Sequence, residues 1–142
     1  MKPLLSTICA MCVSSAMFFA FIVGKEYFSA SQYDLTEDAS VFRDDCNVAM
    51  SSPPDDSPVQ YVLFAYKASM HRLCSCAASQ IQNRYPDRTE LANLVFNTAH
   101  SDQSGESKLA SLHETMATYD LTEGEMAMVM NDVGDAVKEC AT

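Results

Sequence analysis

Two cysteines separated by one residue, Cys74 and Cys76, lie with His71 in the segment HRLCSCAASQ. Thiolate and imidazole groups, with methionine sulfur nearby, suit Cu(I), and a thiol pair can carry out disulfide exchange. In an exported protein, paired cysteines more often form disulfides that cross-link a small domain. The motif is therefore compatible with a metal-handling protein, a redox protein or a stapled scaffold, and the elements around it decide between them.

Helical geometry constrains these cysteines. Residues 58–84 repeat apolar side chains at three- and four-residue steps, which predicts a long amphipathic helix over the motif. Successive helical residues turn by about 100°, so Cys74 and Cys76 point roughly 200° apart and cannot bond to each other. Cys46 and Cys140 also lie outside the N-terminal apolar segment. We expect two disulfides, either Cys46–Cys74 with Cys76–Cys140 or Cys46–Cys76 with Cys74–Cys140.

The alternative function, soft-metal (copper) handling or thiol redox chemistry, would use His71, Cys74 and Cys76. On a helix His71 and Cys74 share a face, whereas Cys76 does not. Methionines at helical spacing are more often core residues than ligands, and the cysteine spacing is not the Cys-x-x-Cys of thiol oxidoreductases.

The sequence contains no arrangement typical of an enzyme. It has no Cys-x-x-Cys-His haem motif, no glycine-rich phosphate loop, no His-Glu-x-x-His and no Gly-x-Ser-x-Gly. Its three histidines are scattered over three predicted segments. We therefore expect a non-enzymatic protein with no catalytic residues and no cofactor.

The chain around the motif is predicted to be all-α. Apolar residues at helical spacing indicate helices over 36–50, 58–84, 87–98, 109–119 and 122–140. No segment alternates with a period of two for long enough to indicate a strand. We expect a small, disulfide-stapled bundle of about four to five helices.

Local signals mark several helix ends. Thr122-x-x-Glu125 has the form of a capping box, and Asp87-x-x-Glu90 opens the third predicted helix. Periodicity also predicts which side chains face the core. The third helix is expected to bury Leu91, Leu94, Val95 and Thr98, and the last helix Met126, Val129, Met130, Val133, Val137 and Cys140.

An apolar N-terminal segment indicates the compartment. Residues 4–24 carry no charge and as a helix would extend roughly 30 Å, the thickness of a bilayer's hydrocarbon core. We expect residues 1–26 to form a signal-anchor transmembrane helix, residues 27–35 a juxtamembrane linker, and residues 36–142 a domain on the periplasmic or extracellular side of the cytoplasmic membrane. Cleavage at a small-x-small site such as 29–31 is the alternative and would make the protein secreted.

The exported part is acidic. All 19 Asp and Glu residues, and all but Lys2 of the 9 Lys and Arg residues, lie from residue 25 onward. Phosphate backbones and anionic lipid surfaces would repel this net charge, so we expect no nucleic-acid partner. A protein partner is expected instead, in part through the transmembrane helix. The acidic surface of the last helix is the candidate binding site, with Asp120, Glu123, Glu125, Asp132, Asp135 and Glu139.

The layout of Cys46, a Cys-x-Cys on a long helix followed by Arg84-Tyr85-Pro86, and a final Cys140 resembles that of small exported helical proteins of bacteria. The resemblance implies an exported helical domain and transfers no functional residues. With a well-specified scaffold and no catalytic arrangement, we expect a membrane-anchored accessory or protein-binding subunit of a membrane or envelope complex.

Overall fold

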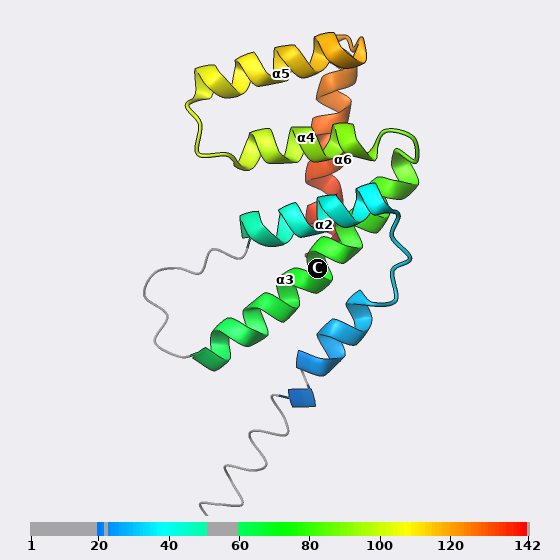
Figure 1. Ribbon diagram of the computed structural model, residues 1–142, viewed down its shortest axis with the longest axis vertical. Coiled ribbons are helices and arrows are strands. Elements are labelled where there is room, and N and C mark those ends of the chain that lie inside the picture. The colour runs from blue at the N-terminus through cyan, green and yellow to red at the C-terminus, as the bar shows by residue number, and fades with distance from the viewer. Residues whose placement is uncertain (1–19, 22, 51–59, 142) are drawn as a thin grey trace, which may run out of the picture.

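The computed structural model describes residues 20–21, 23–50 and 60–141, whose regular structure is entirely helical (Figure 1). Helical residues 20–21 and 23–30 come first. They are followed by α2 (Glu37–Met50), α3 (Gln60–Arg84), α4 (Thr89–His100), α5 (Gly105–Tyr119) and α6 (Glu123–Cys140). The all-α prediction is therefore confirmed for the described part of the chain.

Side-chain caps fix several of these helix ends. The capping box of α6 is confirmed, because the Thr122 hydroxyl accepts from the Glu125 amide while the Glu125 carboxylate accepts from the Thr122 amide. Ser104 caps α5 by accepting from the Ser107 amide, and α5 ends at Asp120, which has a left-handed backbone with φ 52°. These polar contacts replace the hydrogen bonds that the first helical turns lack.

The start of α4 differs from the prediction. The residue at its N-cap position is Arg88, which makes no side-chain capping hydrogen bond. The Thr89 hydroxyl instead donates to the Tyr85 carbonyl at 2.9 Å, which links the start of α4 back to the end of α3. The turn between α3 and α4 is thus stabilised by a contact to the preceding helix rather than by Asp87.

The long helix α3 lies at the centre of the bundle (Figure 1). It packs against α2 and against α6, while α4 contacts both α2 and α6. The largest fully buried side chains come from these helices, among them Phe42, Ile81, Leu91 and Phe96. The rings of Phe42 and Phe96 meet with centroids 5.2 Å apart. Burial of this apolar surface is the main stabilising contribution to the fold.

The inner face of α4 is shifted from the predicted one. Leu91 and Val95 are buried as expected, but Ala92 and Phe96 are buried with them, whereas Leu94 is 39% exposed. The reason is that α4 contacts α2 and α6 together, so its buried stripe is two residues wide at each turn and lies to one side of Leu94. Phe96, a central core residue, was missed by the periodicity argument.

The helix α5 is held more loosely than the others. It contacts α4 and contains no buried residue. Its partly buried Leu112, Met116 and Tyr119 pack against the core, but Leu109 is exposed. Figure 1 shows α5 at the end of the molecule opposite to residues 20–30.

The N-terminal helical residues are attached to the bundle. A polar linker was expected from residue 27, yet residues 23–30 are helical and Ala30 is buried. Glu26 forms an ion pair with Arg72 of α3, with 2.6 Å between the carboxylate oxygen and Nε. Residues 26–30 therefore pack against the bundle through the Glu26–Arg72 ion pair and the buried Ala30.

Two predictions fall largely outside the described residues. The apolar segment 4–24 is described only at residues 20, 21, 23 and 24, and the predicted start of the long helix at residue 58 is not described. Among the helices that the structure describes, none is both long enough and apolar enough to cross a membrane.

Candidate functional site

The four cysteines outside the apolar segment form two disulfides. Cys46 of α2 bonds to Cys74 of α3 with Cα atoms 5.7 Å apart, and Cys76 of α3 bonds to Cys140 of α6 with Cα atoms 5.9 Å apart. This is the first of the two predicted pairings. The 200° separation between Cys74 and Cys76 directs them to opposite neighbours, so α3 is stapled to α2 on one flank and to α6 on the other.

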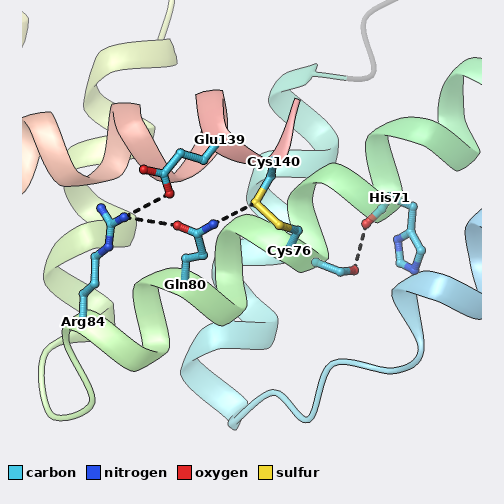
Figure 2. Close-up of a disulfide and its surroundings, with 7 residues drawn as sticks. His71, Cys76, Gln80, Arg84, Glu139 and Cys140 are labelled. Carbon is cyan, nitrogen blue, oxygen red and sulfur yellow. Dashed lines mark hydrogen bonds and ion pairs between the residues drawn. A yellow bond between two sulfur atoms is a disulfide. The ribbon is translucent and has the colours of Figure 1, made fainter. Parts of the chain in front are cut away.

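The two disulfides lie in different surroundings. Both Cys46 and Cys74 are fully buried in the core. Cys76 is only partly buried, and the side-chain amide of Gln80 donates to the Cys140 sulfur at 3.5 Å (Figure 2). The second disulfide is thus a cross-link near the surface at the C-terminal end of α6, within reach of polar groups.

A network of charged side chains continues from this disulfide (Figure 2). The Arg84 guanidinium contacts the Gln80 side-chain oxygen at 3.2 Å, the Glu139 carboxylate at 3.3 Å and the Asp132 carboxylate at 3.6 Å. The Tyr85 hydroxyl donates a short hydrogen bond to the same Asp132 carboxylate. Burial, and then this bond to Asp132, raise the pKa of Tyr85 to about 12. The network joins the end of α3 to α6.

Three of the six acidic residues in the predicted binding surface belong to such structural contacts. Asp132 and Glu139 pair with Arg84, and Glu125 belongs to the α6 capping box. The hydrogen bonds from Thr122 lower the pKa of Glu125. Asp120 occupies the left-handed C-cap of α5, Glu123 lies in the first turn of α6, and Asp135 is an exposed residue later in the same helix.

The candidate metal or redox residues are not assembled into a site. Cys74 and Cys76 are both oxidised and bond to different partners, so neither is available as a thiolate. His71 lies apart from the Cys76–Cys140 disulfide (Figure 2). Within the described ranges, no group of three or more His, Cys, Asp or Glu side chains could hold a metal ion.

His71 instead lines an open pocket of about 290 Å³. Its Nδ1 lies 3.2 Å from the side-chain amide nitrogen of Asn47, and its ring contacts that of Tyr27 at 5.2 Å between centroids. Burial lowers the pKa of His71, and the nearby Arg43 guanidinium lowers it further. The Asp44 carboxylate raises this pKa, but its effect is smaller. The pocket is completed by Val48 and Lys67. No pattern in the sequence predicted this pocket, because its walls come from three separate segments.

The outer side of α6 presents an apolar side chain among acids. Met128 is 59% exposed, and Asp135, seven residues later, lies on the same side of the helix and is also exposed. Met130, expected in the core, is 42% exposed and lies on the opposite flank of the buried stripe formed by Met126, Val129 and Val133. A helix that contacts α3 and α4 buries a narrower stripe than the periodicity predicted.

No family model, curated protein or solved structure matches this chain.

Proposed function

We propose that this chain is a non-enzymatic, membrane-anchored helical domain that acts outside the cytoplasm as a protein-binding accessory subunit of a membrane or envelope complex. The apolar residues 4–24 supply the anchor, and the two disulfides support an oxidising, exported compartment. Cleavage of the N-terminal segment would release the same domain in secreted form.

The observation that carries the protein-binding function is Met128. Exposure of a large apolar side chain to water is unfavourable, and the free energy falls when a partner covers this more than half-exposed side chain. Methionine is common at binding surfaces because its side chain is flexible and polarisable. With Asp135 on the same side of α6, the surface suits a protein that offers an apolar contact flanked by a basic group.

The partner-binding test compares Met128→Glu with Met130→Glu in the full chain. Both methionines are exposed on α6, but they lie on opposite flanks of its buried stripe, so the second variant is a matched control for the added charge. Membranes from the native host are solubilised in mild detergent and separated by native electrophoresis. We expect the unmodified chain and Met130→Glu to migrate in a complex larger than the 15.6 kDa chain, and Met128→Glu to be released from it.

Either of two results would count against this proposal. One is migration of the unmodified chain as a monomer. The other is a complex that Met128→Glu leaves intact, which would exclude this face of α6 as the binding surface.

The alternative function in metal handling or redox chemistry requires free thiols at Cys74 and Cys76. Intact mass after alkylation, with and without prior reduction, counts the free thiols in chain purified from its membrane fraction. The disulfides predict that none of Cys46, Cys74, Cys76 and Cys140 is alkylated before reduction. Alkylation of Cys74 and Cys76 without reduction would favour the alternative, and copper titration would then be the next measurement.

A further inference from the structure

We propose that the bundle docks directly on the lipid headgroups of the membrane that anchors it, through a face made by Tyr27, Val48, Tyr66 and Lys67, which we name the proximal face. This inference rests on the membrane anchoring that forms part of the proposed function. It adds an orientation, in which one end of the bundle contacts lipid while α5 and the start of α6 point away.

The connection between the apolar stretch and the bundle is short and is held by side-chain contacts. Residues 23–30 form one helical segment that begins within the apolar stretch 4–24 and is fixed to α3 by the Glu26–Arg72 ion pair and the Tyr27–His71 ring contact. From residue 24 to residue 30 a helix rises only about 9 Å. A span that ends near residue 24 therefore holds the bundle at the bilayer surface, not on a long flexible tether.

The residues of the proximal face lie next to one another. Tyr27, Val48 and Lys67 line the same open pocket, although they come from the N-terminal segment, α2 and α3. The Tyr66 hydroxyl donates to the Met50 carbonyl at 2.9 Å, which places Tyr66 beside the C-terminal end of α2. The N-terminal segment, α2 and α3 therefore meet at the proximal face.

Several of the side chains exposed at this end are apolar or aromatic. Val48 is 76% exposed and Tyr27 is also exposed. Phe21 and Phe28, seven residues apart on the N-terminal segment, are both more than two-thirds exposed. Aromatic residues concentrate at the interface between membrane and water, where the ring contacts acyl chains and headgroups. Exposed apolar side chains next to a membrane span are therefore explained by contact with lipid.

The charge distribution of the molecule also affects contact with lipid. The whole exported part is acidic, which predicts repulsion from anionic lipid, but the charge is uneven. Segments 20–30 and 60–72 carry Lys25, Lys67 and Arg72 with a single carboxylate, Glu26, which is paired. In contrast, Gly105–Cys140 carries eight carboxylates and two lysines. Figure 1 places α5 at the end far from residues 20–30. Helix α2, which supplies Val48, adds Glu37, Asp38, Asp44 and Asp45 against Arg43. The charge therefore favours lipid contact through the N-terminal segment and α3 over contact through α5.

The test uses the absence of tryptophan from the natural sequence, so that a single introduced indole reports its own surroundings. Full-length chain carrying Val48→Trp is reconstituted into vesicles of phosphatidylcholine and phosphatidylglycerol whose acyl chains carry bromine near the headgroup. Met128→Trp, at a site that is also more than half exposed but lies on the outer side of α6, is the control. Val48 is on α2, so its indole reaches lipid only if the bundle docks. Circular dichroism confirms that each variant is helical.

We expect bromine to quench the emission of Val48→Trp and to leave Met128→Trp unchanged, with both variants floating with the vesicles in a density gradient. If Val48→Trp floats but is not quenched, the docking inference is wrong while anchoring stands, and a partner protein becomes the candidate occupant of the proximal face. Equal quenching of both variants would overturn the orientation. If neither variant floats, the anchor itself fails and the docking inference fails with it.

Discussion

His71 illustrates how a residue that suggests metal chemistry by its neighbours in sequence is placed for a different role by the fold. Its imidazole contacts Tyr27 and Asn47 and lies close enough to Arg43 to be affected by its charge. Burial and this positive charge favour the neutral ring, so the pKa is lower in the folded chain than in the unfolded one. Protonation of His71 therefore opposes folding.

The sign of this effect gives a pH prediction. Between the folded and unfolded pKa values the unfolded chain binds more protons, so the free energy of unfolding rises with pH. The contribution of His71 is fully present above the unfolded value of about 6.5 and is lost as the pH falls through the lower folded value. We expect urea midpoints to fall from pH 7.5 to pH 5.5, and His71→Gln to reduce that fall.

His113 provides the control for this measurement, because it is an exposed histidine on α5. His113→Gln should keep the slope of the unmodified chain. Equal slopes for His71→Gln and the unmodified chain would show that burial of His71 does not couple to stability.

Tyr85 contributes through a hydrogen bond between helices. Its hydroxyl donates to the Asp132 carboxylate, and removing the donor in Tyr85→Phe should lower the free energy of unfolding by about 1 kcal/mol. Because the folded pKa is raised to about 12, this stabilisation is present below the ordinary tyrosine pKa near 10 and is lost as the pH rises through the folded value. Urea unfolding at pH 7 measures the difference.

Tyr33→Phe is the control, since no hydrogen bond of the Tyr33 hydroxyl is found in the described chain. A similar loss of stability in both variants would contradict the prediction.

Among the elements, α5 is the one whose stability depends least on the common core. It contains no buried residue and contacts α4, whereas α3 buries several residues and is cross-linked at both flanks. Local opening costs little where few apolar groups leave the core. Amide hydrogen exchange followed by mass spectrometry should therefore show faster exchange for Gly105–Tyr119 than for the stapled part of α3. Equal protection of the two helices would mean that they open only together, in global unfolding.

At the scale of the whole molecule, the two disulfides should differ in how easily they are reduced. Thiol exchange needs access of a thiolate to sulfur. Cys46 and Cys74 are fully buried, whereas Cys76 is partly exposed and bonds to Cys140 in the last turn of α6. Brief treatment with a dithiol reductant, followed by alkylation and peptide mapping, should label Cys76 and Cys140 before Cys46 and Cys74. Simultaneous labelling of all four would indicate that reduction requires global unfolding.

The sequence by itself determined the order and approximate positions of the helices from Glu37 onward and part of the chemistry. Helix positions followed from periodicity, and the end of α2 and the start of α6 followed from residues close in sequence, because turns and caps are local interactions. Residues 27–30 were expected in a linker but are helical, and α5 begins at Gly105 instead of at residue 109. The spacing of Cys74 and Cys76 was also enough to exclude a bond between them. The angle between their side chains depends only on the rotation per residue within one helix.

Only the tertiary structure decided which segments meet. The choice of Cys46 for Cys74 and of Cys140 for Cys76 depends on which side of α3 each neighbour occupies. The burial of Phe96 and the exposure of Leu94 and Met130 depend on how many helices contact α4 and α6. The pairing of Arg84 with carboxylates on α6, and the pocket around His71, likewise join residues far apart in the chain. Local sequence carries the period of a helix, whereas these contacts are set by the packing of several helices at once.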